Sequence, residues 1–118
     1  MLTNKDTVIA FDVDDTLIMD PKDQDEDTYF IDPYDGLQTR RAVHKRHVKL
    51  LKDHYAKGYF VIVWSANGQR WAERVVEALG LNNFVHAILA KPIKIVDDLP
   101  VTEWMGPRIY LEDKWITD

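Results

Sequence analysis

The chain has 118 residues, which is the length of one compact domain and leaves no room for a second domain of ordinary size. Hydrophobic residues make up 46% of the chain and charged residues 30%, which predicts a self-folding globular domain and excludes a disordered or fibrous chain. The absence of cysteine excludes thiol nucleophiles and cysteine-ligated zinc, and the formal net charge of −5 disfavours a general nucleic-acid binder.

The first predicted element is a strand over Val8–Phe11. This apolar run is short and is followed at once by polar residues, as is typical of a strand buried on both faces of a parallel sheet. The residues before it form no apolar signal core, and no apolar run in the chain approaches the roughly 18 residues of a membrane span. We therefore expect a cytoplasmic protein with no membrane partner.

The next segment is acidic and short. Leu17–Met19 and Thr28–Ile31 flank its acidic centre, and the pattern predicts the two arms of a hairpin. From Asp12 to Asp35 the chain holds ten acids and one base. Residues 17–37 are too few for an independent cap domain, so we interpret them as a flap within a single domain that spans residues 1–118.

A helix with a basic outer face is predicted over residues 38–57. Val43, Val48, Leu51 and Tyr55 keep helical spacing, and Gly58 stands where a helix would stop. Residues 36–57 carry seven Lys or Arg and one acid. His44, His47 and His54 form no metal-ligand motif there, and we expect them on the surface.

Strands and helices alternate through the rest of the chain. Tyr59–Trp64 is a continuous apolar run and predicts a second buried strand, and Gln69–Leu79 has helical spacing and ends at Gly80. Three shorter strands are predicted at Ala87–Ala90, Ile93–Val96 and Arg108–Leu111. This alternation predicts an α/β fold with a mainly parallel central sheet and no separate cap domain, and ligands then bind beyond the carboxyl ends of the strands.

Polar side chains follow the predicted strands at the point where each one ends. The carboxylates of Asp12 and Asp14 leave the same strand and repel each other, so a cation between them would be favourable. Magnesium suits such a place, because it needs few carboxylates and leaves room for phosphate oxygens. A nearby lysine and a hydroxyl group would then serve a phosphoryl group. The set that follows the strands is Asp12, Asp14, Thr16, Ser65, Lys91, Asp97 and Asp98.

Phe11–Leu17 contains the pattern DxDxT and resembles the first motif of the haloacid dehalogenase superfamily phosphatases. The later motifs of that family also have matches here and in the family's order. They are a serine after an apolar strand, matched by Ser65, then a lysine, matched by Lys91, then acids after a strand, matched by Asp97 and Asp98. The resemblance spans residues 8–98 and implies a three-layer Rossmann-like fold and a phosphatase activity.

Carried over residue by residue, the resemblance implies that Asp12 is a nucleophile that forms an aspartyl-phosphate and that Asp14 is the general acid and base. Mg²⁺ would be held by Asp12, Asp14 through its main-chain carbonyl, and Asp97. The phosphoryl oxygens would be bound by Ser65 and Lys91, and Thr16 would fix the first loop. Asp98 would contact the residues that bind the metal rather than the metal itself.

Two positions depart from the family's usual pattern. Asp15 occupies a place where glycine is common, so the loop has an added charge and a less permissive backbone. Lys91 and Asp97 are only six positions apart, which is too short for a crossover helix and is similar to compact deoxyribonucleotidases. The short connection conflicts with parallel pairing of both Ala87–Ala90 and Ile93–Val96, so one of the two is expected to be an unpaired extended segment.

Other interpretations stay open at this stage. The acids of the first loop could cap a turn, Ser65 could be a turn residue, and Lys91 could be a solvated lysine. Glu112 and Asp113 also follow a predicted strand and compete with Asp97 for the metal. A receiver-type phosphoacceptor module and a relative that only binds a partner are alternatives to the phosphatase.

The expected partner is a small phosphorylated substrate, with a nucleoside monophosphate preferred to a polynucleotide end. The aromatic side chains of Tyr29, Phe30 and Tyr34 follow the nucleophile loop and could stack on a base. With so short a flap, the site is either open or closed by a neighbouring subunit of a homo-oligomer. The acidic run would repel a polynucleotide, whereas the basic helix face would attract one. That run comprises Asp20, Asp23, Asp25, Glu26 and Asp27, and that face Arg40, Arg41, Lys45, Arg46 and Lys49.

Overall fold

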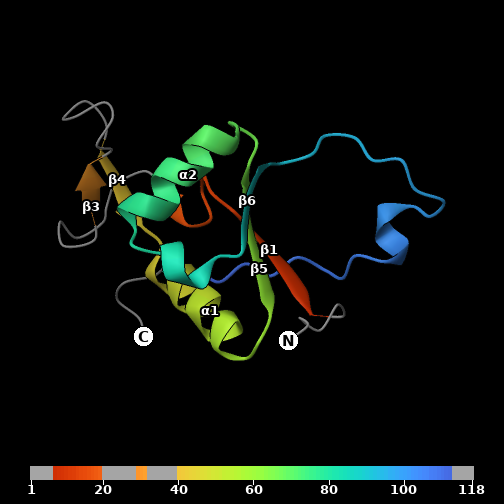
Figure 1. Ribbon diagram of the computed structural model, residues 1–118, viewed down its shortest axis with the longest axis horizontal. Coiled ribbons are helices and arrows are strands. Elements are labelled where there is room, and N and C mark those ends of the chain that lie inside the picture. Colours follow the sequence, from red (N-terminus) through yellow and green to blue (C-terminus); the bar gives the residue numbers. More distant parts are fainter. Residues whose placement is uncertain (1–6, 20–28, 32–39, 113–118) are drawn as a thin grey trace.

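A three-stranded parallel sheet forms the centre of the computed structural model, and its strand order is β1–β5–β6 (Figure 1). These strands are β1 (Val8–Asp12), β5 (Phe60–Ser65) and β6 (Ala87–Ala90). Asp12 pairs with Trp64, and Ser65 pairs with Ala90, so all three strands end at one edge. The structure describes residues 7–19, 29–31 and 40–112.

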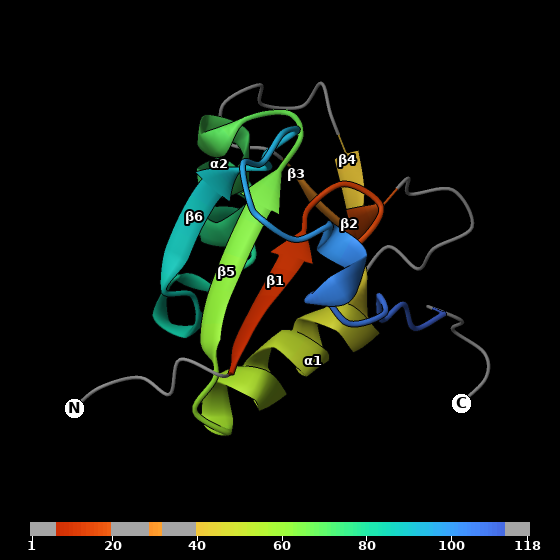
Figure 2. The same ribbon diagram turned by 90° about the vertical axis from the view of Figure 1, so that its right-hand side faces the viewer.

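Two helices cover one face of this sheet, and an irregular segment crosses the other face (Figures 1 and 2). The helices are α1 (Lys45–Ala56) and α2 (Gln69–Ala78). Residues 91–112 run over the opposite face and contain one short 3-10 helix, η3 (Val101–Glu103), and a similar turn, η2 (Asn82–Phe84), precedes β6. The predicted α/β fold with a mainly parallel central sheet is confirmed.

The hydrophobic core lies between the sheet and the two helices. In β5 the side chains alternate, and Val61, Val63 and Ser65 are buried on the side that faces the helices. Phe11 joins them from β1, and Leu51 is fully buried on α1. The helical spacing identified Val48 and Leu51 on α1 and Val75 and Val76 on α2 as core-facing residues. It was wrong for Val43, which belongs to β4, and for Tyr55, which is 39% exposed.

A second, small sheet has the order β2–β4–β3 and lies beside the end of β1 (Figure 2). Its strands are β2 (Ile18–Met19), β3 (Tyr29–Ile31) and β4 (Arg40–Val43), and both pairings are antiparallel. The predicted hairpin between the first two strands is wrong, because β4 lies between them. Ala42 is fully buried in β4 and pairs with Met19 on one side and Tyr29 on the other.

The basic helix begins later than its apolar spacing predicts. Residues 40–43 form β4, and α1 starts only after His44. The Nδ1 atom of His44 accepts a hydrogen bond from the backbone N–H of His47 at 3.2 Å and so caps the helix. At the other end Gly58 has a φ of 92°, which a glycine adopts without strain and which ends the helix as predicted.

Two predicted strands are absent from the described residues. Ile93–Val96 and Arg108–Leu111 are irregular, and β6 forms the edge of the sheet. Only a few residues separate β6 from Ile93, and a parallel neighbour needs a much longer crossover. Ile93–Val96 is therefore the unpaired segment that the short connection predicts. No helix in the described part of the chain has the length and apolar character needed to traverse a bilayer.

Candidate active site

Asp12 is the last residue of β1, and its side chain meets two partners at the edge where the strands end. The hydroxyl of Thr16 donates to its Oδ2 at 3.3 Å, and the Nζ atom of Lys91 lies 3.8 Å from its Oδ1. The Asp12 side chain is 32% exposed, so a ligand can still reach it. Three of the residues that sequence reasoning selected are thus brought together by the ends of β1 and β6.

The loop after Asp12 is a tight turn built on one carbonyl group. The backbone N–H groups of Thr16 and Leu17 both donate to the carbonyl oxygen of Val13. Asp15 has a φ of 65°, in the left-handed region that favours glycine and that aspartate tolerates better than most residues. The glycine common in similar phosphatases therefore corresponds to a real backbone requirement, which this chain meets with aspartate.

Asp14 is held by two side chains that follow β5. The amide of Asn67 donates to its Oδ2 at 2.8 Å, and the indole Nε1 of Trp71 donates to the same oxygen at 3.1 Å. These bonds orient the Asp14 carboxylate from two directions. The sequence analysis did not identify either partner, because Trp71 fits the helical spacing of an ordinary packing residue and Asn67 follows a strand like a turn residue. The signal for Trp71 was its place in the first turn of the helix that follows Ser65.

Ser65 contributes to the site mainly through its backbone. Its carbonyl oxygen accepts the backbone N–H of Lys91 at 2.9 Å, which places the lysine beside the end of β5. The hydroxyl of Ser65 accepts the backbone N–H of Asn67 at 2.9 Å and is buried on the helix-facing side of the sheet. Ser65 thus positions the two residues that contact Asp12 and Asp14.

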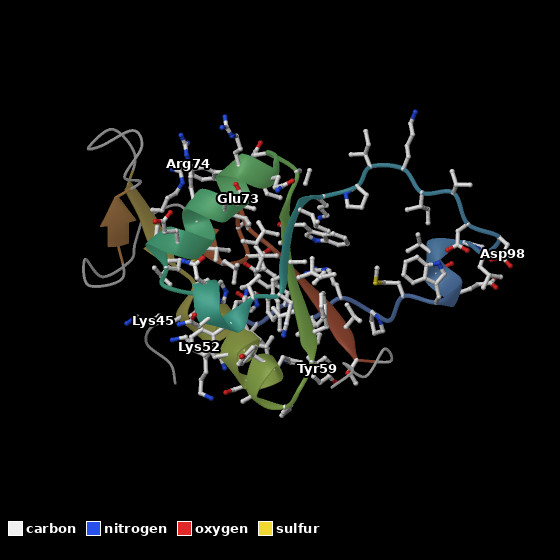
Figure 3. The ribbon with its side chains drawn as sticks, in the orientation of Figure 1. Lys45, Lys52, Tyr59, Glu73, Arg74 and Asp98 are labelled. Carbon is white, nitrogen blue, oxygen red and sulfur yellow. The ribbon has the colours of Figure 1, made fainter. Side chains whose placement is uncertain are left out.

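The acids assigned to the metal lie apart in the structure. Figure 3 places Asp98 at the outer end of the 91–112 segment, away from the sheet. Its neighbour Asp97 is exposed, and Asp97 Oδ1 accepts the backbone N–H of Leu99 at 3.1 Å. Among the residues that the structure describes, no group of three or more His, Asp or Glu side chains could hold a metal ion.

The donors on the first loop suit magnesium as a partial set. Mg²⁺ is commonly bound by one or two carboxylates together with water and substrate phosphate oxygens. Asp12 offers an accessible carboxylate. Asp97 does not complete this set in the arrangement described. Asp113, its rival, lies outside the described residues.

The histidines of α1 are not on the surface as predicted. His44 and His47 are buried, and their rings stack with centroids 3.7 Å apart. The Nδ1 atom of His47 lies 2.7 Å from the carbonyl oxygen of Thr16, and its Nε2 accepts the backbone N–H of Leu111 at 2.8 Å. His47 therefore bridges the DxDxT loop and the 91–112 segment. The prediction failed because a histidine among basic residues gives no sign of burial.

A second contact ties the same two segments together. The hydroxyl of Tyr110 donates to the carbonyl oxygen of Asp15 at 3.1 Å, and its ring packs edge-on against His47 at a centroid distance of 4.8 Å. The end of the 91–112 segment is therefore anchored beside the DxDxT loop.

A cavity of about 500 Å³ opens between this anchored segment and β1. Asp12, Thr16 and Lys91 are among its lining residues. The remaining walls come from β1, from Trp64, from α1 and from residues 105–110. The cavity thus runs along β1, and Asp12, the candidate nucleophile, lies at one end of it.

Several predicted substrate contacts lie outside the described residues. These are Tyr34, the side chains of Tyr29, Phe30 and Arg40, and the acidic run Asp20, Asp23, Asp25, Glu26 and Asp27. Arg41 is described, and its guanidinium lies 5.7 Å from the Trp71 ring. The basic stretch therefore begins next to a residue that holds Asp14.

Replacing His47 by leucine should destabilise the fold, because it removes both hydrogen bonds of the bridge and leaves two partly buried backbone groups, the Thr16 carbonyl and the Leu111 N–H, without these partners. We expect a loss of about 2 kcal/mol or more in the free energy of unfolding, measured by urea denaturation. His54→Leu is the matched control, since the hydrogen bond of the His54 ring runs to the Leu50 carbonyl of its own helix and joins no other segment. Equal losses in the two variants would contradict a bridging role for His47.

The family of the chain follows from a comparison with protein-family models. The model of the NLI interacting factor-like phosphatases, a haloacid dehalogenase-like family, matches residues 7–101. This range contains Asp12, Ser65, Lys91 and Asp97. Searches among curated proteins and among solved structures gave no significant match. Because the matched range covers most of its length, the chain belongs to the NLI interacting factor-like phosphatase family.

Proposed function

We propose that the protein is a magnesium-dependent phosphomonoesterase that works through an aspartyl-phosphate on Asp12. The observation that carries this proposal is the position of the Asp12 carboxylate, which lies between the Lys91 ammonium and the Thr16 hydroxyl at the edge where three parallel strands end. Membership of a phosphatase family supports the reaction class.

In the first step a carboxylate oxygen of Asp12 attacks the phosphorus atom of a phosphomonoester. A P–O bond forms to Asp12, the P–O bond to the leaving group breaks, and the leaving oxygen takes the bonding pair. The Thr16 hydroxyl holds Oδ2, so Oδ1 on the Lys91 side is the oxygen that attacks. Lys91 attracts the negative phosphoryl oxygens and stabilises the charge that they carry in the transition state.

Asp14 transfers the protons. In its protonated form it gives a proton to the leaving oxygen, and it then takes one from the water that attacks the aspartyl-phosphate, which releases inorganic phosphate and restores Asp12. The hydrogen bonds from Asn67 and Trp71 fix the direction of this carboxyl group. Asp14 stays turned toward these two donors, whereas Asp12 faces Lys91 and Thr16, which separates the acid–base role from the nucleophile.

Magnesium would be held by the carboxylate of Asp12 and the main-chain carbonyl of Asp14, with Asp97 as the third protein ligand. When bound, it would offset negative charge between the Asp12 carboxylate and the phosphoryl group. Asp97 reaches the site only if residues 92–104 adopt another arrangement than the one described, while Tyr110 and Leu111 keep their contacts with Asp15 and His47. Asp98 lies beside Asp97 and would move with it.

The assignment of Asp12 as the nucleophile can be tested by substitution. Asp12→Asn should reduce the hydrolysis of 4-nitrophenyl phosphate by at least about a thousandfold, because an amide does not attack phosphorus, and chelation of Mg²⁺ should abolish the wild-type rate. Activity is followed by release of the phenolate, and Asp53→Asn on the outer face of α1 is the control. Near wild-type rates in Asp12→Asn would refute the assignment. A phosphorylated protein that never turns over would favour a receiver-type or inactive binding module.

The second prediction concerns the third metal ligand. Asp97→Ala should raise the Mg²⁺ concentration needed for half-maximal activity by about tenfold or more, whereas Asp113→Ala should change it little, because Asp97 is the acid that matches the family's fourth motif. A Mg²⁺ titration of the rate measures both variants. A larger increase in Asp113→Ala than in Asp97→Ala would identify Asp113 as the metal ligand instead.

The proposed substrate is a small phosphomonoester, with a nucleoside monophosphate preferred to a polynucleotide end. The spacing of Lys91 and Asp97 resembles that of deoxyribonucleotidases, and the acidic run of residues 20–27 would repel a chain of phosphates. The second candidate, a polynucleotide end phosphatase, is favoured by the basic side chains of α1. Lys45 and Lys52, labelled in Figure 3, are exposed on this helix, and the Nζ atom of Lys52 lies 5.2 Å from the centroid of the Phe84 ring.

Rates on a mononucleotide and on an oligonucleotide with the same terminal phosphate separate these two candidates. We expect a higher kcat/KM for the mononucleotide, with little dependence on salt, because few phosphates contact the protein. A preference for the oligonucleotide that fades as the salt concentration rises would establish the second candidate instead.

A further inference from the structure

We propose that the cavity along β1 binds a flat, apolar ring system in the leaving group of the substrate. This inference rests on the proposed function, because it treats the Asp12 end of the cavity as the place of the phosphoryl group. It adds a specific chemical class, namely phosphomonoesters whose leaving group carries an aromatic ring.

The floor of the cavity is the face of β1 that carries the candidate nucleophile. Side chains alternate along a strand, so Val8 and Ala10 project to the same side as Asp12. Val8 is 51% exposed and Ala10 is exposed, because the helices cover only the other face. Trp64 pairs with Asp12 in register and also lines the cavity. An apolar surface thus continues directly from the Asp12 carboxylate.

The opposite wall is a mainly apolar stretch of the 91–112 segment. Met105, Pro107, Ile109 and Tyr110 line the cavity from this side, and Ile109 is 57% exposed. Arg108 also lines it, and its guanidinium lies 5.6 Å from the centroid of the Tyr110 ring. Exposed apolar side chains on two facing walls gain free energy when a flat apolar group enters between them and displaces water. Polar side chains gather at the end marked by Asp12, Thr16 and Lys91, where the phosphoryl group would lie.

The wall is anchored, so the cavity is formed before a ligand binds. Tyr110 donates to the Asp15 carbonyl, and the next residue, Leu111, donates to His47. Both contacts tie the wall to elements that also hold the DxDxT loop. A ring that binds against this wall is therefore placed in a fixed relation to Asp12, which favours reaction over loose binding.

The dimensions suit a ring system joined to phosphate. The volume of about 500 Å³ is within the usual range for small-molecule sites. From Val8 to Asp12 the strand extends about 13 Å at roughly 3.3 Å per residue, which accommodates an aryl ester or a nucleoside. In-line displacement puts the leaving group on the side of phosphorus away from the attacking oxygen, so it extends from Asp12 into the remaining space.

Two matched pairs of substrates test the proposal. 5′-AMP and ribose 5-phosphate share the leaving oxygen of a primary alcohol and differ by the base. 2-Naphthyl phosphate and phenyl phosphate are both aryl esters and differ by one ring. We expect the larger member of at least one pair to have a KM lower by about tenfold, because the added ring buries apolar surface. A gain in the first pair identifies a nucleotide, and a gain in the second pair alone identifies an aryl ester.

Two isoleucines on the same segment provide a matched pair of variants. Ile109 lines the cavity, whereas Ile95 is 47% exposed and does not line it. Ile109→Ser should raise the KM of the larger substrate of each preferred pair severalfold, and should raise the KM of its smaller partner less, because the smaller partner buries less apolar surface. Ile95→Ser should change none of these values. A KM that is equal within each pair in the wild type, or equal effects of the two variants, would overturn the proposal.

A binding measurement separates failure of this inference from failure of the proposed function. 2-Naphthylphosphonate and phenylphosphonate cannot be hydrolysed, and calorimetry gives their Kd values without turnover. One outcome is that no ester is hydrolysed in an Asp12-dependent way, while 2-naphthylphosphonate binds more tightly than phenylphosphonate and only Ile109→Ser weakens its binding. This outcome would support the ring site and refute the phosphatase mechanism. The other outcome is hydrolysis that depends on Asp12 together with equal Kd values for the two phosphonates. It would support the phosphatase mechanism and refute the ring site.

Discussion

Parallel pairing of β1, β5 and β6 is the constraint on which the rest of the structure depends. Parallel strands bring their carboxyl ends to one edge, and the register places Asp12 opposite Trp64 and Ser65 opposite Ala90. Lys91, the first residue after β6, therefore arrives beside Asp12 although 79 positions separate them in the sequence. A slip of one residue in either pairing would turn Asp12 toward the helices or carry Lys91 away from it.

A second constraint is the buried bridge at His47. An imidazole with one nitrogen on the Thr16 carbonyl and the other on the Leu111 amide joins the loop of the candidate nucleophile to the segment that lines the cavity. Neutral histidine suits this place because it can donate through one nitrogen and accept through the other. The geometry of the loop, the position of the wall and the start of α1 are thus linked, since His44 caps α1 and stacks on His47.

Most of the central sheet and much of the candidate site could be predicted from the sequence. Val8–Phe11 and Tyr59–Trp64 are apolar runs that predict β1 and β5, and the polar residues that follow them fall together once the strands are parallel. The prediction that the first strand is buried on both faces is wrong, because Val8 is 51% exposed and Ala10 is exposed on the face that the helices do not cover. The small sheet could not be predicted, because the apolar spacing of residues 38–57 is helical throughout. It gave no sign that residues 40–43 form the strand β4, in which Ala42 is buried. The roles of Asn67, Trp71 and His47 depend on contacts across the fold, which no local pattern reports. Ile93–Val96 has the composition of a strand but too short a connection to pair.

The most direct test of the account is the detection of phosphate on Asp12. During turnover of a phosphomonoester with Mg²⁺, an aspartyl-phosphate can be reduced by borohydride, which converts the modified aspartate to homoserine. Mass spectrometry of the peptide that contains residues 7–19 then identifies the position. The proposed mechanism predicts homoserine at position 12, which should depend on substrate and be absent in Asp12→Asn. Homoserine at Asp14 or at another acid, or steady hydrolysis with no trapped residue under conditions where the intermediate accumulates, would contradict it.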